Sequence, residues 1–152
     1  MKIIEVDLKN LNLEANTEMN LVLGFFDGVH IGHQEMISKA VNNGDTGVMT
    51  FDISPSFILG KSIKYTHITS LYDKANVLKT LGVKYLYVLR MNKELLNLDK
   101  SEFIEKILKP ISPKRIYVGE DYHFGRNAEG TPNDLEKYFN VHAYFRKDIS
   151  IG

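Results

Sequence analysis

Residues 21–34 read Leu-Val-Leu-Gly-Phe-Phe-Asp-Gly-Val-His-Ile-Gly-His-Gln, an apolar run followed by a segment with three glycines and two histidines. The apolar run predicts a buried strand at 20–23, and the residues that follow the turn predict a helix over 32–41. Glycines let the backbone approach a ligand closely, and the first turn of a helix presents N–H groups that have no partner within the helix. The stretch therefore predicts a strand, a phosphate-binding turn and a helix.

The rest of the chain alternates in the same way between short apolar strands and amphipathic helices. Further strands are expected at 47–51, 85–89, 115–119 and 142–145, and further helices at 70–81, at 100–108 and from 131 onward. Asp99 and Thr131 are expected to cap helices; Gly82 is expected to end the helix over 70–81, and Pro110 and Pro113 to end the helix over 100–108. Short apolar strands that alternate with helices indicate a parallel sheet covered on both faces. We therefore expect an α/β fold, a Rossmann-like, doubly wound parallel sheet of about five strands.

The composition of the chain is that of a soluble globular domain. It has 152 residues, of which 43% are hydrophobic and 25% charged, and we expect one domain over residues 1–152. The formal net charge of +0 gives no reason to expect a nucleic acid or a membrane as partner, and the absence of cysteine excludes disulfides and thiolate chemistry. No apolar run approaches the roughly 20 residues that span a bilayer. The acidic residues between Met1 and Asp7 do not fit a signal peptide, so a cytoplasmic location is expected.

The site is expected in the loops that follow strands, because ligands of doubly wound sheets bind beyond the carboxyl ends of the strands. These loops are 24–33, 52–68, 90–98 and 119–131. His30 and His33 are the first candidates, since imidazoles beside a helix N-terminus can donate hydrogen bonds to phosphate oxygens. Two other interpretations stay open: the histidines cap the helix or lie on the surface, or they belong to a metal site.

The pattern H-x-G-H at residues 30–33 resembles the signature that nucleotidyltransferases share with class I aminoacyl-tRNA synthetases. The longer string G-x-F-D-G-V-H-x-G-H-Q is similar to the opening motif of bacterial FAD synthetases, in the FMN adenylyltransferase module of the bifunctional riboflavin kinase/FAD synthetase family. The resemblance covers nearly the whole chain and implies a nucleotidyltransferase fold of the HIGH type. It implies catalytic roles for His30, His33 and Asp27, although Asp27 also fits a turn-forming role. The ATP-binding residues that it implies are Gly24, Phe25, Phe26, Asp27, Gly28, His30, Gly32, His33 and Arg126.

Two further strings carry the resemblance. Residues 119–131 resemble the family string V-G-x-D/N-F-x-F-G, and residues 50–57 correspond to its T-F-x-P-H-P loop, with Ile53 and Ser54 in place of the Pro-His pair. Both loops border the flavin in the family. The implied flavin-binding residues are Phe51, Asp52, Pro55, Phe57, Asp121, Phe124 and Gly125. The alternative is that these are ordinary loops in which the phenylalanines are buried anchors and Arg126 is solvated.

The resemblance implies transfer of AMP from ATP to FMN, which gives FAD and pyrophosphate, with Mg²⁺ as cofactor. The chain stops at Gly152, about where the second family motif, I-S-S-T-x-I-R, would begin, so we expect it to lack that motif and the riboflavin kinase module. The alternatives are a non-catalytic or weakened relative that binds ATP or flavin, a truncated fragment, and a nucleotidyltransferase with another phosphorylated acceptor. No oligomeric state is predicted.

Overall fold

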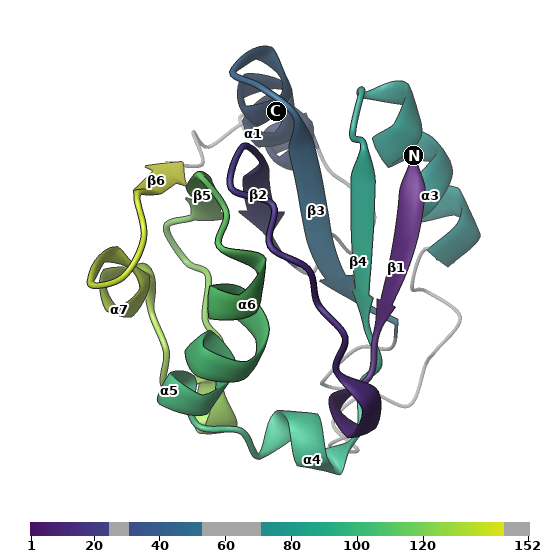
Figure 1. The fold of residues 1–152 in the computed structure, drawn as a ribbon. Helices are drawn as coiled ribbons and strands as arrows, with labels where there is room; N and C mark the ends of the chain where they lie inside the picture. The colour runs from purple at the N-terminus through teal and green to yellow at the C-terminus, as the bar shows by residue number, and fades with distance from the viewer. Residues whose placement is uncertain (25–30, 53–70, 145–152) are drawn as a thin grey trace, which may run out of the picture.

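The computed structural model describes residues 1–24, 31–52 and 71–144, and these residues form a single parallel sheet with helices on both faces (Figure 1). Its described strands are β1 (Lys2–Val6), β2 (Asn20–Leu23), β3 (Thr46–Phe51), β4 (Tyr85–Leu89), β5 (Arg115–Gly119) and β6 (Val141–Tyr144). Their order is β1-β4-β3-β2-β5-β6, and every neighbouring pair is parallel. The predicted α/β class and parallel sheet are confirmed.

The sheet has six strands among the described residues, one more than the sequence predicts. The additional strand is β1, which lies at one edge and pairs only with β4. Lys2, Ile3 and Glu5 are exposed there, whereas strands in the middle of the sheet are buried along nearly their whole length. An edge strand tolerates charged residues because part of it meets water, and for that reason its sequence lacks the apolar run that marks the other strands.

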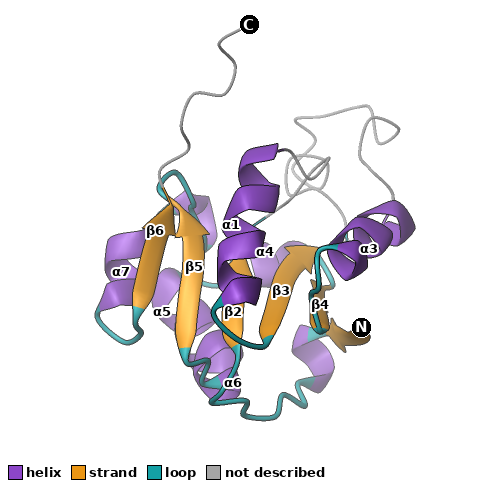
Figure 2. Ribbon diagram, turned by 90° about the horizontal axis from the view of Figure 1, so that it is seen from above, coloured by secondary structure: helices purple, strands orange, loops and turns teal. Residues whose placement is uncertain are grey.

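Two apolar clusters hold the helices against the sheet. One face carries α1 (Ile31–Asn42) and α3 (Leu71–Thr80), which pack through Ile37 and Leu78 on Val48 and neighbouring strand residues. The other face carries α5 (Lys100–Phe103), η2 (Ile104–Leu108), α6 (Lys109–Ile111) and α7 (Pro132–Glu136), whose apolar side chains join Leu21, Met49 and Val118. Figure 2 shows α1 in front of the sheet and α5 and α7 behind it.

Most of the predicted helices are confirmed, with one correction at Pro110. Asp99 caps α5 through a reciprocal capping box with Glu102, and Gly82 follows α3 with a φ of 95°. Of the two prolines predicted to end the helix after Asp99, Pro110 does not, because α6 continues to Ile111, and the helix ends directly before Pro113 with Ser112 as its C-cap. The π-helical turn η2 ends at Leu108, two residues before the proline, and in it the Lys109 N–H bonds to the Ile104 carbonyl in place of the ordinary α-helical partner. This wider turn accommodates a residue that lacks an N–H and would crowd an α-helical carbonyl.

The loop predicted over 90–98 contains a short helix, α4 (Lys93–Leu96), that the sequence analysis misses. Its N-cap is Asn92, whose side chain accepts a hydrogen bond from the Leu95 N–H at 2.8 Å. A helix of one turn is too short to show the periodicity that reveals longer helices, so only its capping residue signals it.

Candidate active site

Strands β2 and β5 are parallel neighbours and end side by side at the carboxyl edge of the sheet. In the register, Leu23 of β2 lies between Met49 of β3 and Val118 of β5, so Gly24 and Gly119 leave the sheet at the same level. Strands β3 and β4 lie on one side of β2, whereas β5 and β6 lie on the other, so the winding of the chain reverses between β2 and β5. Ligand sites of open α/β sheets lie at such a reversal.

The segment after β2 begins with Gly24, whose N–H donates to the Met49 carbonyl at 3.3 Å. The helix α1 begins at Ile31, and its first turn contains His33 and Gln34, both partly exposed. The start of α1 therefore places His33 at the carboxyl edge. Five of the predicted ATP-binding residues lie outside the described residues, and the surroundings of Gly32 are outside them too; the five are Phe25, Phe26, Asp27, Gly28 and His30.

The loop after β5, residues 119–131, is held by backbone hydrogen bonds. Phe124 and Gly130 bond to each other in both directions, at 3.2 and 2.7 Å, and form an antiparallel bridge. The Arg126 N–H donates to the Leu98 carbonyl at 2.7 Å, which ties the loop to the residues before α5. Gly125 has a φ of 80°, and a Cβ at this position would lie 3.0 Å from the backbone nitrogen of Lys100. Glycine is needed here because the backbone angle and the close approach both exclude a side chain.

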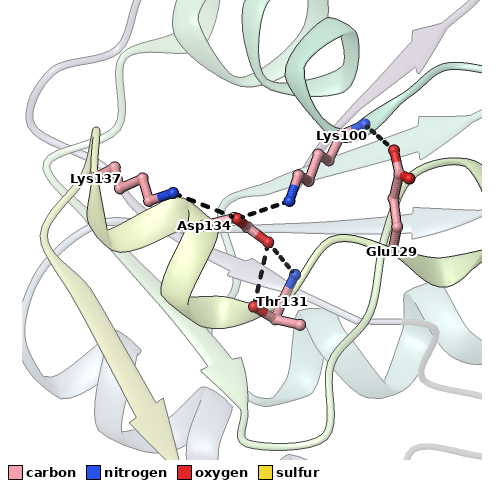
Figure 3. Close-up of polar contacts among 5 residues, drawn as sticks. All are labelled: Lys100, Glu129, Thr131, Asp134 and Lys137. Atoms are coloured by element: carbon pink, nitrogen blue, oxygen red, sulfur yellow. Dashed lines mark hydrogen bonds and ion pairs between the residues drawn. The ribbon is translucent and has the colours of Figure 1, made fainter.

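Hydrogen bonds and ion pairs that involve side chains also hold the same loop (Figure 3). The Lys100 N–H donates to Glu129 Oε1 at 3.3 Å, and the Lys100 ammonium lies 3.2 Å from Asp134 Oδ1. Asp134 Oδ2 also accepts from the N–H and the hydroxyl of Thr131, at 2.9 and 3.2 Å, and so completes the predicted cap of α7. The hydrogen bond from the Thr131 backbone and the nearby Lys100 ammonium lower the pKa of Asp134. The network joins the end of the loop to α5 and α7.

Phe124, a predicted flavin contact, lies in the apolar core. Its side chain is 5% exposed, and its ring centroid is 5.4 Å from that of Phe103 and 5.9 Å from that of Tyr122. Burial raises the pKa of the Tyr122 phenol. In this arrangement both rings serve the packing beneath the loop, which matches the alternative of a buried anchor; a direct flavin contact by Phe124 stays a prediction.

The other residues predicted to contact flavin or phosphate fall into two groups: some are exposed, and others bond or pack within the fold. Asp121 and Arg126 are exposed beyond the end of β5, where they are accessible to a ligand. Asp52 accepts a hydrogen bond from the Met91 N–H at 2.8 Å, so its carboxylate connects the ends of β3 and β4. Phe51, at the end of β3, is partly buried against the core. Pro55 and Phe57 lie outside the described residues.

One buried charged residue escapes the sequence analysis. Lys74 in the first turn of α3 is only 2% exposed, and its ammonium donates to the Thr50 hydroxyl at 3.2 Å. The signal for it is present in the sequence, because Lys74 falls on the apolar side of the helix together with Leu71 and Leu78.

A metal site is not apparent within residues 1–24, 31–52 and 71–144, where no three His, Asp or Glu side chains converge in a way that could hold an ion. Asp27, the carboxylate that the sequence analysis considers for Mg²⁺, lies outside these ranges. Within the same ranges, no helix has the length and apolar character needed to cross a membrane.

Comparison with known families and proteins gives consistent results. A family model described as FAD synthetase matches residues 12–149. The chain is 39% identical over 132 residues to a bifunctional riboflavin kinase/FMN adenylyltransferase of Listeria monocytogenes, a match that covers 80% of this chain and 41% of the relative. It is 33% identical to the protein of the same description from Bacillus subtilis, over 81% of this chain and 42% of that protein. The chain thus spans less than half the length of these two relatives.

Solved structures agree on the fold. A Streptococcus pneumoniae structure titled a macrolide-efflux protein superposes with a TM-score of 0.78 and 31% identity, covering 94% of this chain and 51% of that one. The pantothenate synthetase of Thermus thermophilus superposes with a TM-score of 0.58 at 14% identity over 95% of this chain and 62% of that one, a likeness of fold alone.

Proposed function

The chain belongs to the FAD synthetase family, and from that premise we propose that it is an FMN adenylyltransferase, which transfers AMP from ATP to FMN. The observation that carries the proposal is the order of the strands in the sheet. The two strings that resemble the family motifs follow β2 and β5, and these strands are neighbours at the reversal of winding. The two strands that precede these strings thus end next to each other, at the edge where such sheets bind ligands.

The reaction requires positioning and charge stabilisation more than covalent chemistry. A phosphate oxygen of FMN attacks the α-phosphorus of ATP; a new P–O bond forms, and the bond from the α-phosphorus to the oxygen bridging it to the β-phosphate breaks. The leaving group is pyrophosphate, which departs with the electron pair and with developing negative charge. An enzyme accelerates such a step by aligning the two phosphates and by stabilising that charge.

In the proposed site the ATP phosphates lie at the start of α1. N–H groups in the first turn of a helix attract anions, and His33 lies in that turn. His30 has the matching role on the basis of the motif alone. Arg126 approaches from the loop after β5, where its exposed guanidinium is available to a phosphate.

The flavin is proposed to bind along the loop after β5, next to Asp121. The loop suits this role because its backbone bridge and its ties to α5 hold it in one conformation before any ligand arrives. A preformed loop reduces the ordering cost of binding. Phe124 supports the loop from beneath.

Mg²⁺ is part of the proposal as a partner of the ATP phosphates. The described residues do not supply a set of protein ligands for it, so we assign none and attribute no step to the ion. When bound to the phosphates it would reduce their negative charge.

The experiment is to incubate the chain with ATP, FMN and Mg²⁺, and to follow FAD by chromatography together with pyrophosphate release. Equimolar FAD and pyrophosphate are expected. His33→Ala is expected to lower turnover by a factor of about 100 or more while circular dichroism stays unchanged. Wild-type turnover in that variant would contradict the site assignment.

The second candidate function is a binding protein for ATP or flavin without turnover. The observation that favours it is that the start of α1 and the loop after β5, which is held by its own backbone bridge, can bind a nucleotide or a flavin without any chemical step. Saturable binding of ATP or FMN without FAD formation would support this candidate and overturn the proposed reaction for this chain.

A further inference from the structure

Tyr122 lies in the turn directly after β5, and its hydroxyl has no hydrogen-bond partner among residues 1–24, 31–52 and 71–144. Its backbone N–H donates to the Gly119 carbonyl at 3.1 Å, which closes the turn. Its ring packs against the apolar core and stacks on Phe124, with the ring centroids 5.9 Å apart and the planes inclined by 21°. Burial raises the pKa of the phenol, and no hydrogen bond or charge within these ranges contributes to the change. The hydroxyl has therefore lost most of its water without gaining a described protein partner.

Two other tyrosines beside the sheet have partners for their hydroxyls. The Tyr117 hydroxyl accepts a hydrogen bond from the Asn43 amide at 2.8 Å, and the Tyr144 hydroxyl donates to the Glu35 carboxylate. Buried tyrosine hydroxyls usually find such a partner, because an unpaired polar group loses its bonds to water on burial. A phenylalanine would fill the space of Tyr122 without that cost. The Tyr122 hydroxyl therefore indicates a partner that the described residues do not supply.

The position of Tyr122 allows a ligand to be that partner. Strand β5 ends at Gly119, beside the end of β2, at the carboxyl edge of the sheet. The Tyr122 side chain is only partly buried, and Asp121 directly before it is exposed. Phe124, two residues further on, lies in the core. Tyr122 thus lies at the border between the apolar core and the surface of the candidate site.

The neighbours of Tyr122 favour a neutral aromatic ligand over an anion. The exposed carboxylates of Glu120 and Asp121 come directly before it in the chain and would repel a phosphate. Because the pKa of the phenol is raised, the hydroxyl stays protonated and can donate a hydrogen bond. The isoalloxazine ring of a flavin has apolar faces and carries carbonyl oxygens, which are acceptors, at one edge. A donor without an acceptor, set among aromatic rings, is complementary to that edge.

We propose that the Tyr122 hydroxyl is a specificity-determining donor, which forms a hydrogen bond to a carbonyl oxygen of the isoalloxazine ring of FMN. The inference deepens the proposed function and rests on it for the identity of the ligand. The contact lies on the flavin ring, away from the reacting phosphate, so Tyr122 takes no part in the transfer of AMP.

The test compares Tyr122→Phe with Tyr117→Phe, since each variant removes one hydroxyl and keeps the ring. Titration calorimetry gives the dissociation constants of FMN, riboflavin and ATP, and thermal unfolding gives the midpoint temperature. For Tyr122→Phe, FMN and riboflavin should both bind about 10-fold more weakly, because they share the ring and differ in the phosphate. ATP affinity should stay unchanged, and the midpoint should stay the same or rise.

Tyr117→Phe is expected to behave in the opposite way. It deprives the Asn43 amide of its acceptor, so the midpoint should fall by about 2–4 °C while the flavin affinities stay unchanged. Unchanged flavin affinities in Tyr122→Phe would overturn the proposal. A loss confined to FMN would overturn it too, because the hydroxyl would then face the phosphate. A midpoint that falls as far in Tyr122→Phe as in Tyr117→Phe would show a structural partner and equally overturn it.

Flavin analogues give a second, independent measurement. In 2-thio-FMN and 4-thio-FMN, a sulfur atom replaces one ring carbonyl oxygen and is a weaker acceptor. The wild-type chain should bind one of the two analogues more weakly than FMN, and this difference should disappear in Tyr122→Phe. If the wild type and Tyr122→Phe discriminate equally between FMN and both analogues, the hydroxyl does not contact a ring carbonyl.

The outcome for the proposed function stays distinguishable. A wild-type chain that binds FMN but forms no FAD disproves the transferase and leaves the role of Tyr122 measurable. A wild-type chain that forms FAD while Tyr122→Phe binds FMN normally keeps the transferase and disproves the donor. A wild-type chain that binds neither FMN nor riboflavin overturns both.

Discussion

Lys74 and Lys100 lie on opposite faces of the same sheet, and their surroundings differ. Lys74 is enclosed between α3 and the sheet and bonds to a hydroxyl. The Lys100 side chain is 43% exposed and pairs with the carboxylate of Asp134, in a network of short ties around the loop after β5. Many small contacts around Lys100 together hold the loop after β5, whereas the Lys74 side chain is buried in the interior and bonds to the Thr50 hydroxyl.

The comparison indicates that the ion pairs in the structure do not identify the residues that contribute most to its stability. Exposed pairs contribute about 0 to 1 kcal/mol, because water and salt screen them. The loop after β5 should therefore depend mainly on Phe124 and Gly125, and only slightly on the carboxylates and lysines around it. Four substitutions test this ranking of contributions to stability, and they are given from the largest expected effect to the smallest.

The largest effect is expected for Phe124→Ala, which removes a buried ring that contacts Phe103 and Tyr122. Loss of such a ring lowers the free energy of unfolding by about 3–5 kcal/mol. Urea denaturation measures it, with Tyr138→Ala as the control, since Tyr138 is 54% exposed and should cost little. A stable Phe124→Ala variant that loses only flavin binding would show that the ring serves the ligand and not the core.

Next in size is Gly125→Ala, at φ 80° and ψ 177°. Backbone angles of this kind cost a residue with a side chain on the order of 1–3 kcal/mol, and the new methyl group would meet the backbone of Lys100. Thermal unfolding should therefore shift down. Gly119→Ala is the matched control, because its Cβ would meet only the movable side chain of Asp121. Equal losses in the two variants would exclude the backbone explanation.

A smaller effect, about 1 kcal/mol at neutral pH, is expected for Asp134→Ala, which removes the capping interaction with Thr131 and the pair with Lys100. The pKa of Asp134 is lowered in the fold from its ordinary value of 3.8, so its contribution is present above that value and is lost as the pH falls below it. Urea midpoints of the wild type and the variant should differ at pH 7 and converge in acid. A difference that grows toward acid pH would contradict the assigned sign.

The smallest effect is expected for Glu5→Gln, which breaks the 2.6 Å ion pair between Glu5 and Arg90 at the edge of the sheet. Both side chains are more than half exposed, so the free energy of unfolding should change by less than about 0.5 kcal/mol. A loss above about 1 kcal/mol would show that surface charge matters more in this fold than the comparison implies.

The sequence predicts elements well where local patterns decide them. Apolar runs locate β2 to β6, and capping residues such as Asp99 and Thr131 mark the starts of α5 and α7. It misses β1, whose charged residues are tolerated at an edge, and it ends the helix after Asp99 at Leu108, although the helix passes Pro110 and ends at Ile111, before Pro113. The family motifs identify the loops of the candidate site.

By itself, then, the sequence determined the alternation of strands and helices, the parallel α/β class and the loops that carry the family motifs, because each depends on residues close together in the chain. Only the tertiary structure decided that β2 and β5 are neighbours, that Phe124 lies in the core and that the Lys74 ammonium bonds to the Thr50 hydroxyl. Strand order and these particular contacts join segments that are distant in the sequence, and no local pattern encodes which segments meet.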